Sequence, residues 1–417
     1  RRYQPIAKNL YVQQRNFDKI LVHTKHEMMT PQQVLQNHST FLTEHEKSEI
    51  LQFPDIYYFG QNCKNKQYQF SSYNGGFDDR DGDYLPIIND HIGYRYEIHQ
   101  MIGFGAYGKV YRVFDWKKQQ FEALKIIKNR KKFRKQGFVE IQILEKIRHN
   151  DPARQTNCVI FRNRGEFRGH LFITFQLMQK DLKQVMADYD LKGLPILKIR
   201  EISFQLVKAL QYSASLNIIH ADIKPDNVMF LQENSSKIQL IDWGAGAFVN
   251  QTIYQYIQQR QYRAPEVILG MPYSTEIDTW SLGCLLYEIF TGQQLFQGEN
   301  EFDQIGKICE VLGYPPQEML SKAPRKQEFF WDVSDSQVRL RTNHKAKSQK
   351  LHLLLKAAGR DYTEVVNKML QWEPEMRVTM DEALKMRFFE SCLLQKGDTV
   401  MSTTQIQPQS IQQSDLK

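Results

Sequence analysis

Two short polar motifs carry the side chains best suited to catalysis. The first is His220-Ala221-Asp222-Ile223-Lys224-Pro225-Asp226-Asn227, and the second is Asp242-Trp243-Gly244. A carboxylate can accept a hydroxyl proton, and a nearby lysine can stabilise negative charge on a transferred phosphoryl group. An asparagine and a second aspartate supply the oxygen ligands that Mg²⁺ prefers. The motifs therefore predict one site that combines a proton acceptor, a cation and two metal ligands.

A glycine-rich stretch lies upstream of these motifs. Gly103-Phe104-Gly105-Ala106-Tyr107-Gly108-Lys109-Val110 follows the pattern G-x-G-x-x-G-x-V. Glycine lets backbone N–H groups approach phosphate oxygens, because a Cβ atom would obstruct them. Taken alone, the stretch is better explained as a plain glycine-rich hairpin. It is followed by Lys125 and Glu140, however, and such a Lys–Glu pair would orient the ammonium toward nucleotide phosphates.

The order and spacing of the motifs strengthen the interpretation that they belong to one catalytic site. Ala264-Pro265-Glu266 follows Asp242 at the interval expected of an activation segment. Four motifs thus occur in the order that phosphoryl transfer requires, and chance is a poor explanation of all four.

The elements that must position these residues change along the chain. Short runs of β-branched and aromatic residues predict an antiparallel sheet with strands at 94–98, 110–113 and 122–127. Helical spacing at 137–148 predicts a helix with Phe138, Ile141, Leu144 and Ile147 on one side. Beyond residue 180 the apolar pattern is mostly helical, with a central buried helix expected around 279–286. This pattern predicts an α+β fold.

The first 93 residues are polar but contain two helix-start signals. Thr30–Gln33 and Thr43–Glu46 have capping-box patterns, the first with Pro in the first turn. We expect the two helices to bury Val34, Leu35, Ile50 and Leu51. Asn74-Gly75-Gly76 predicts a turn, and the acidic stretch Asp78 to Asp83 predicts an exposed loop.

Composition excludes several classes of protein. The chain has 417 residues, of which 41% are hydrophobic. Its formal net charge of +8 is spread over the whole chain, and this charge density is too low to indicate nucleic-acid binding. No apolar stretch approaches the roughly 20 residues of a membrane span, so we expect a soluble, intracellular protein. The five cysteines are scattered, which favours reduced thiols. The basic run Lys128 to Lys135 is either a nuclear-localisation or phosphate-binding patch or, as we favour, a solvated face.

The motifs together resemble those of eukaryotic protein kinases over about residues 96–390. Within the CMGC group, the chain is similar to the dual-specificity tyrosine-phosphorylation-regulated kinase (DYRK) family. The segment Tyr254-Gln255-Tyr256-Ile257-Gln258-Gln259-Arg260-Gln261-Tyr262-Arg263-Ala264-Pro265-Glu266 resembles that family's Y-x-Y-I-Q-S-R-F-Y-R-A-P-E. Asn89-Asp90-His91-Ile92-Gly93-Tyr94-Arg95-Tyr96-Glu97 resembles its DH box, and residues 30–60 resemble the N-terminal extension of class II members.

The resemblance implies a bilobal fold. A small antiparallel-sheet N-lobe with one main helix is expected at about 94–178, and a larger, mostly helical C-lobe at 179–390. Residues 1–93 would form an accessory region docked on the small lobe, with a flexible tail as the alternative. Residues 391–417 are expected to form a mobile tail.

The resemblance also implies roles for individual residues. Asp222 would be the catalytic base and Lys224 would steady the moving charge, while Glu140 would pair with Lys125. Asn227 and Asp242 would hold Mg²⁺. The expected ATP-binding residues are Ile102, Gly103, Gly105, Gly108, Val110, Ala123, Lys125, the gatekeeper Phe175, and the hinge residues Gln176, Leu177 and Met178.

A second set of expected roles concerns regulation and support. Tyr256 would be autophosphorylated and bound by Arg260 and Arg263, because two guanidinium groups can bind a phosphate through paired hydrogen bonds. The alternative is that Tyr256 only packs in its loop. The remaining expectations are an ion pair between Glu266 and Arg377, and anchoring of the catalytic loop by Asp278.

Five positions depart from the family pattern, and two of them, Gln259 and Gln261, replace Ser and Phe beside the expected phosphotyrosine. Ala221 stands where other kinases have the Arg of H-R-D, which argues against regulation through that arginine. Trp243 replaces the Phe of D-F-G, and its indole must pack under the helix that carries Glu140. Gln184 stands where the family often has an acidic residue near the substrate, although Asp226 could supply part of a preference for upstream arginine.

The leading functional hypothesis is ATP·Mg²⁺-dependent phosphorylation of Ser/Thr-Pro sites in proteins, with tyrosine phosphorylation confined to Tyr256. The rivals are a noncatalytic scaffold that binds partners through residues 1–93 and 137–148, and a small-molecule kinase. We expect a monomer in the cytoplasm, the nucleus or both, with no direct nucleic-acid or membrane partner.

Overall fold

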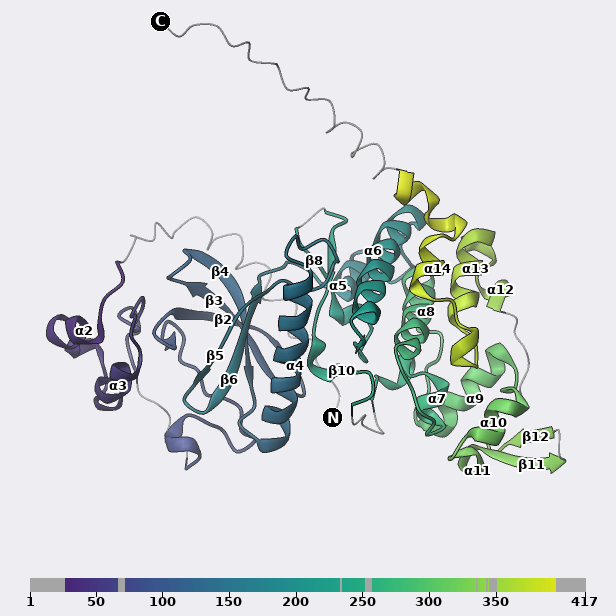
Figure 1. Ribbon diagram of the computed structural model, residues 1–417, viewed down its shortest axis with the longest axis horizontal. Coiled ribbons are helices and arrows are strands. Elements are labelled where there is room, and N and C mark those ends of the chain that lie inside the picture. The colour runs from purple at the N-terminus through teal and green to yellow at the C-terminus, as the bar shows by residue number, and fades with distance from the viewer. Residues whose placement is uncertain are drawn as a thin grey trace, which may run out of the picture. The chain divides into compact units, whose positions relative to one another are not determined.

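The computed structural model describes residues 27–66, 72–232, 235–251, 257–334, 337–342, 344 and 351–394. These residues form two compact units (Figure 1). The first comprises the described residues up to 130 together with 164–174, and the second comprises 131–163 and the described residues from 175 onward. Within these ranges, no helix combines the length and apolar character needed to cross a membrane.

A six-stranded sheet, in the order β1-β2-β3-β4-β6-β5, is the framework of the first unit. Its strands are β1 (His91–Ile92), β2 (Tyr96–Phe104), β3 (Gly108–Asp115), β4 (Gln120–Ile127), β5 (Phe161–Phe167) and β6 (His170–Gln176). The antiparallel pairing of β2, β3 and β4 confirms the three predicted strands. Strands β1 and β5 escaped prediction because β1 has only two residues and β5 is interrupted by charged side chains and a glycine.

Two short helices precede the sheet, and both begin with the predicted capping box. Helix α2 (Pro31–Asn37) is capped by Thr30, and helix α3 (Glu44–Glu49) by Thr43. In each box the threonine Oγ1 accepts from the N3 backbone N–H at 3.2 Å, which satisfies a donor that the helix itself leaves open. Val34 and Ile50 are fully buried as expected, but the expectation for Leu51 is wrong, since its side chain is 56% exposed.

The N-terminal segment and the sheet share one hydrophobic core. Its members include Val34, Ile50, Ile56 and Phe59 from before the sheet, and Tyr94, Tyr96, Ile98, Tyr111 and Leu124 from the sheet region. Burial of each large apolar side chain stabilises the fold by about 1.5–3 kcal/mol. The described part of the N-terminal region is therefore docked on the sheet, as predicted.

The acidic stretch 78–83 is exposed only at its tip, at Arg80 and Asp81, whereas its two ends are buried. Asp78 is 3% exposed and accepts hydrogen bonds from Asn74 and Asn129 at 2.7 and 3.0 Å, and its carboxylate lies 2.6 Å from Nε2 of His170. Asp83 is 9% exposed and faces Lys128 at 3.1 Å. The prediction failed at Asp78 and Asp83 because His170, Asn129 and Lys128 lie far away in the sequence. The predicted turn at 74–76 is present as a short 3₁₀ helix.

The second unit is mainly helical, as predicted. Its helices are α4 (Lys131–Asn150), α5 (Leu182–Asp188), α6 (Ile196–Ser215), α7 (Pro265–Ile268), α8 (Glu276–Thr291), α9 (Glu301–Leu312), α10 (Gln317–Lys322), α11 (Lys326–Phe329), α12 (Leu351–Leu354), α13 (Arg360–Met369) and α14 (Met380–Leu384). Three two-stranded sheets accompany them, namely β7 (Ile218–Ile219) with β10 (Ala247–Phe248), β8 (Val228–Phe230) with β9 (Ile238–Leu240), and β11 (Phe330–Ser334) with β12 (Gln337–Leu340).

Helix α8 forms the centre of this unit. Trp280, Leu282 and Leu285 are fully buried, which confirms the predicted central helix. Figure 1 shows α6 and α13 near α8, and both helices contact it. Helix α4 confirms the predicted helix at 137–148, and it buries Ile141, Leu144 and Ile147 while Phe138 is 44% exposed. Of the expected C-terminal tail, 391–394 are helical and 395–417 lie outside the described residues.

Candidate functional site

The glycine-rich stretch is the hairpin between β2 and β3 in the first unit. The N–H of Gly105 donates to the carbonyl oxygen of Gly108 at 2.9 Å. A Cβ atom on Gly108 would lie 2.0 Å from the carbonyl oxygen of Ile126, so the fold itself requires this glycine. A Cβ on Gly105 would meet nothing within 4 Å, so packing within the protein does not explain that glycine. An open backbone at Gly105 suits the approach of a phosphate group.

Lys125 shares one face of the sheet with two of the expected ATP-binding residues. Val110 on β3 is its direct cross-strand partner, and Ala123 lies two residues earlier on the same strand. Because side chains alternate along a strand, all three point to the same side of the sheet. The Lys125 side chain is largely buried, with Nζ 5.9 Å from the centroid of the Tyr107 ring. Ile102 lies on β2 and is 44% exposed.

The second unit brings the catalytic-loop side chains together. Nζ of Lys224 lies 2.6 Å from Oδ2 of Asp222. Nδ2 of Asn227 donates to the same oxygen at 2.9 Å and to the Asp222 carbonyl oxygen at 2.8 Å. The predicted proton acceptor, cation and first metal ligand are therefore in direct contact.

Asp278 anchors this loop from α8, as predicted. Its two carboxylate oxygens accept the backbone N–H groups of His220 and Ala221 at 2.7 and 2.9 Å. Ala221 has φ +63°, a left-handed conformation that costs a residue with a Cβ about 1–2 kcal/mol. The two hydrogen bonds from Asp278 hold the loop in this strained geometry, directly before Asp222.

Burial controls the ionisation of these groups. It raises the pKa of Asp222, an effect that Asp242 increases and Lys224 opposes. It also raises the pKa of Asp278 to about 7, although the two backbone N–H donors act in the opposite direction. Burial lowers the pKa of His220 to about 4. His220 is therefore neutral at pH 7, with Nε2 donating to the Ile241 carbonyl at 2.9 Å and Nδ1 accepting from the Asp222 N–H at 3.2 Å.

Asn227 and Asp242 lie on segments that a hydrogen bond joins. The N–H of Ile241 donates to the Asn227 carbonyl at 2.9 Å, which places the residue before Asp242 against Asn227. Asp242 has φ +60°, and its Oδ1 accepts from the Gly244 N–H at 3.4 Å. The Asn227 side chain uses its Nδ2 group to donate to Asp222. The Asn227 amide oxygen points away from Asp222 and can serve as an acceptor or a metal ligand. A carboxylate and an amide oxygen fit the ligand preference of Mg²⁺.

Trp243 is fully buried beneath α4, as predicted. Helix α4, which carries the buried Glu140, contacts the 3₁₀ turn Trp243–Ala245. The indole lies edge-on to the His220 ring, with 4.6 Å between centroids. The Trp243 Nε1 atom is buried and has no hydrogen-bond partner among the described residues. Tryptophan in place of phenylalanine therefore adds an N–H donor that makes no hydrogen bond in this structure.

The expected hinge follows β6, which ends at Gln176. The N–H of Gln176 donates to the Ile160 carbonyl at 3.0 Å, and Phe175 is partly buried. Leu177 and Met178 lie outside regular structure, and within the described ranges their backbone groups make no hydrogen bond. Their N–H and carbonyl groups are thus free to bind a ligand.

The described part of the activation segment is held by Arg263, which is 1% exposed. Its guanidinium donates to the carbonyl oxygens of Ile257 and Gln258, both at 2.8 Å, and pairs with Glu301 at 2.9 Å. Arg260 donates to the Glu299 carbonyl at 2.6 Å. Tyr256, the expected phosphorylation site, lies outside the described residues.

The predicted ion pair between Glu266 and Arg377 is present and buried. The two guanidinium nitrogens lie 2.6 and 2.7 Å from the two carboxylate oxygens. This bidentate pair joins the start of α7 to the turn that precedes α14. It fixes the end of the activation segment and has a structural role.

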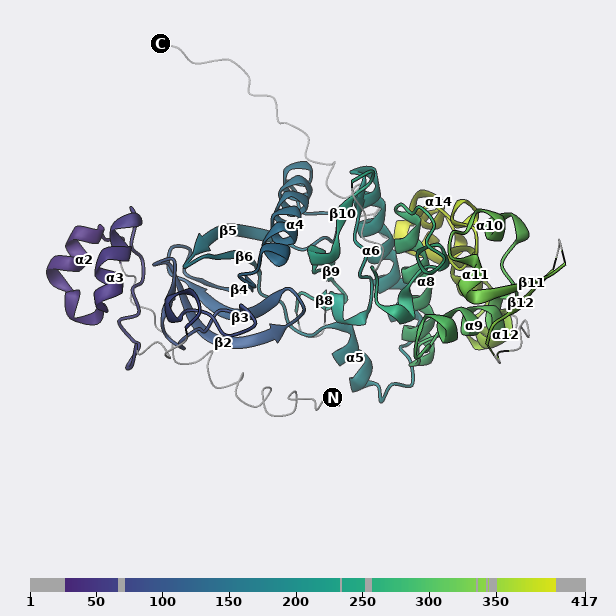
Figure 2. The same ribbon diagram turned by 90° about the horizontal axis from the view of Figure 1, so that it is seen from below.

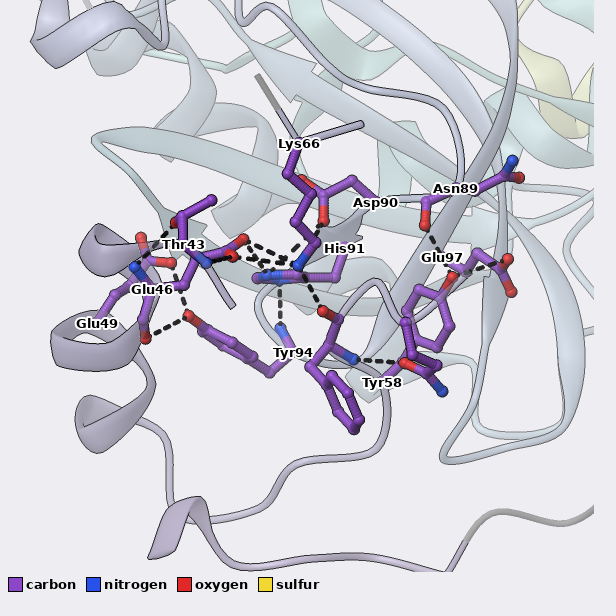
Figure 3. Close-up of polar contacts among 12 residues, drawn as sticks. Thr43, Glu46, Glu49, Tyr58, Lys66, Asn89, Asp90, His91, Tyr94 and Glu97 are labelled. Carbon is purple, nitrogen blue, oxygen red and sulfur yellow. Dashed lines mark hydrogen bonds and ion pairs between the residues drawn. The ribbon is translucent and has the colours of Figure 1, made fainter. Parts of the chain in front are cut away.

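A buried charged cluster, which sequence reasoning missed, joins α3 to β1 in the first unit (Figure 3). Nε2 of His91 lies 3.1 Å from Glu46, and Arg168 pairs with Glu46 at 3.3 Å and with Glu49 at 2.9 Å. Burial would raise the pKa of Glu46, but His91 and Lys66 lower it well below its usual value. The Asp-His pair of the DH-box-like segment offered a signal, because two such polar residues beside a strand need partners when buried.

Lys66 completes this cluster. Its ammonium lies 3.1 Å from Glu46 and 3.5 Å from Asp90, and it donates to the Phe59 carbonyl at 2.6 Å. Glu46, Asp90 and His91 also have ligand atoms within 4.8 Å of one another, a spacing that suits a metal ion. The lysine supplies the positive charge that these carboxylates need, so the cluster is an internal ion-pair network.

Comparison with known proteins relates these features to one family. Residues 96–389 match the family model described as the protein kinase domain. The chain is 40% identical over 372 residues to the dual specificity tyrosine-phosphorylation-regulated kinase 2 of Drosophila melanogaster, an alignment that covers 87% of this chain and 51% of the relative. It is 37% identical over 363 residues to the human dual specificity tyrosine-phosphorylation-regulated kinase 4, which covers 86% of this chain and 69% of the relative.

A yeast relative shows similar coverage. The serine/threonine-protein kinase ppk5 of Schizosaccharomyces pombe is 39% identical over 357 residues, or 83% of this chain and 42% of the relative. The chain thus spans about half the length of the Drosophila relative and less than half of the yeast one.

Proposed function

The chain belongs to the dual specificity tyrosine-phosphorylation-regulated kinase family of protein kinases, and from this premise we propose that it transfers the γ-phosphoryl group of ATP to serine and threonine hydroxyls of proteins. The observation that carries the proposal is the contact of Asp222 with both Lys224 and Asn227. A carboxylate between a cation and a metal ligand can orient a hydroxyl and receive its proton as the phosphoryl group moves.

The proposed chemistry assigns a role to each side chain of the catalytic loop. Asp222 accepts the proton of the substrate hydroxyl, and Lys224 stabilises the charge that develops on the transferred group. Asn227 and Asp242 would hold Mg²⁺, which neutralises charge on the nucleotide phosphates when bound. Asp278 positions the loop through its hydrogen bonds to His220 and Ala221. Most of the acceleration would come from positioning and electrostatics.

Nucleotide binding is assigned to residues of both units. In the first unit, the open backbone of Gly105 supports phosphate binding, and Lys125 shares a sheet face with Val110 and Ala123. In the second, the unused backbone groups of Leu177 and Met178 support adenine binding. The full proposed set is Ile102, Gly103, Gly105, Gly108, Val110, Ala123, Lys125, Phe175, Gln176, Leu177 and Met178, with Glu140 as the partner of Lys125.

The finer proposal is that the acceptor residue is followed by proline. Gln258 has φ +61°, and its carbonyl oxygen accepts from Arg263 at 2.8 Å. That oxygen is thus already engaged and is a poor acceptor for the N–H of a substrate residue. Proline has no N–H to satisfy, so it would lose nothing at this position. A peptide library without a preference for proline after the acceptor would contradict this part.

We also propose that Tyr256 is autophosphorylated, with Arg260 and Arg263 as partners of the phosphate. The support is the family of the chain and the location of Arg263 beside Ile257. Because Arg263 pairs with Glu301 at 2.9 Å, a phosphate on Tyr256 would compete with Glu301 for this guanidinium. Residues 1–93 would be an accessory region to a kinase domain at 94–390.

Phosphosite-resolved mass spectrometry of the chain expressed in bacteria, beside an identically prepared Asp222→Asn variant, tests the proposal. Phosphate on Tyr256 in the wild type only is the expected result. If neither protein carries it, peptide phosphorylation with ATP·Mg²⁺ separates failure of autophosphorylation from failure of catalysis. If the chain also fails to phosphorylate peptides, the kinase proposal is overturned.

A further inference from the structure

An exposed tryptophan marks the hairpin of β11 and β12, which lies beside α10 and α11 at the edge of the second unit (Figures 1 and 2). Trp331 is 53% exposed and Val333 is 62% exposed. Trp331 lies opposite Arg339 across the hairpin and Val333 lies at a β-bulge of β11, whereas the neighbouring pair Phe330 and Leu340 is buried. The fold thus uses the pair of Phe330 and Leu340 for its core and leaves Trp331 and Val333 to solvent.

Two arginines complete the exposed surface, which we call the hairpin face (Trp331, Val333, Arg339 and Arg341). Arg339 is the cross-strand partner of Trp331, and the Arg341 guanidinium lies 3.3 Å from the centroid of the indole ring. Among the described residues, neither arginine pairs with a carboxylate. The nearest acid on β11, Asp332, is already paired with Lys326 at 2.5 Å. The hairpin face therefore carries uncompensated positive charge beside exposed apolar surface.

The surrounding sequence has the same charge bias. Residues 336–360 include seven Lys and Arg but no Asp or Glu, whereas the whole chain has 55 basic and 47 acidic residues. Arg339 and Arg341 on the hairpin face can attract an acidic ligand and steer its approach.

We propose that the hairpin face is a docking surface for an extended, acidic segment of another protein. Two guanidinium groups can bind carboxylates through paired hydrogen bonds, and Trp331 and Val333 offer contact area for one apolar side chain. The hairpin is a two-stranded sheet, so an extended peptide can also add along an unpaired strand edge. Nucleic acid fits less well, because Arg341 already covers one side of the only indole on this face.

Binding at the hairpin face can be tested independently of catalysis, because none of its four residues belongs to the proposed active site. Fluorescence anisotropy of a labelled 12-residue peptide, with Asp and Glu alternating around one central Phe and one Leu, measures the binding directly. We expect binding in the micromolar range at 0.1 M salt, weakened at least tenfold by Trp331→Ala and by Arg339→Glu. A peptide with Lys in place of the acids should not bind.

Control substitutions outside the hairpin face test whether the peptide binds this face specifically or is attracted to any exposed apolar or basic side chain. Met376→Ala removes another exposed apolar side chain, and Lys192→Glu makes the same charge change at another exposed site. Both should bind the acidic peptide as the wild type does. Thermal melting confirms that each variant is folded, and Trp331→Phe provides a conservative second variant that should lose less than threefold.

Three outcomes would overturn the proposal. They are no binding of the acidic peptide, equal losses in the hairpin and control variants, and tighter binding of a single-stranded RNA of equal charge with the same dependence on Trp331 and Arg339. The last result would assign the face to nucleic acid instead.

Discussion

The ammonium group of Lys109 lies 3.6 Å from a carboxylate oxygen of Asp79. Lys109 directly follows the last glycine of the glycine-rich hairpin, whereas Asp79 belongs to the acidic turn that precedes the sheet. Asp83 of the same turn lies 3.9 Å from Lys109 and 3.1 Å from Lys128. The N-terminal region therefore contacts the base of the hairpin to which we assign phosphate binding.

We predict that the double substitution Asp79→Asn and Asp83→Asn raises the KM for ATP about two- to fivefold and changes kcat less. The expected size follows from exposed or partly exposed ion pairs, each of which contributes about 0.2–1 kcal/mol. Steady-state kinetics at low salt measures the effect, which should shrink at 0.5 M salt because salt screens the pairs. Asp81→Asn in the same turn is the control. An unchanged KM in the double variant would show that the turn does not affect the hairpin.

The neutral state of His220 predicts a pH-dependent stability. Its pKa is about 4 in the folded protein, against 6.5 for an ordinary histidine. Between these values the unfolded chain binds a proton that the folded chain does not, so stability is lost as pH falls from 6.5 toward 4. The slope from this group is at most about 1.4 kcal/mol per pH unit.

Urea unfolding at a series of pH values measures this slope. The variant His220→Asn should lose part of the decrease between pH 6.5 and 4.5, whereas His149→Asn, at an exposed site, should retain it. Identical slopes in the wild type and in His220→Asn would contradict the assignment.

The buried pair of Glu266 and Arg377 predicts a large stability effect. Arg377→Met should destabilise the protein by about 3–5 kcal/mol, because it leaves the Glu266 carboxylate buried without its cation. Lys322→Met breaks an exposed pair with Glu318 and should cause no measurable change in the unfolding midpoint. Equal effects of the two substitutions would contradict a special role for the buried pair.

The cluster around Glu46 predicts a second buried-charge effect, in the first unit. Lys66→Met should destabilise the protein by about 3 kcal/mol, since Glu46 and Asp90 lose a shared cation. Thermal melting measures the change, with Lys64→Met as the control at an exposed position close in sequence. A melting temperature equal to that of the control would show that Arg168 and His91 alone balance these carboxylates.

Prediction from sequence succeeded where the signal is local or is carried by a motif. The capping boxes at Thr30 and Thr43 involve residues three positions apart, so their hydrogen bonds follow from the sequence as soon as a helix begins. The contact of Asp222 with Lys224 and Asn227 depends on one short loop, and the motif predicted it. The pairing of Asp278 with the catalytic loop and of Glu266 with Arg377 came from the family resemblance.

Prediction of side-chain exposure failed where it relied on local composition, because tertiary contacts decide which side chains are covered. The Asp78–Asp83 stretch has the composition of an exposed loop, but His170 and Asn129 cover Asp78 and Lys128 covers Asp83. Leu51 adjoins the buried Ile50 and Phe138 shares a helix side with the buried Ile141, but no part of the described structure covers either side chain fully. Periodicity indicates which residues share a face, but the neighbours decide how wide the buried stripe is.

The sequence by itself determined the chemical groups, their order and the local turns and caps, because these depend on residue type and on neighbours a few positions away. Apart from the pair of Glu266 and Arg377, which the family resemblance implied, only the tertiary structure decided which distant charges meet. It placed Lys66 between Glu46 and Asp90, Glu301 against Arg263, and Asp79 against Lys109. Such pairs form only after the apolar side chains have built a core, since that core sets which polar groups lie within hydrogen-bonding distance.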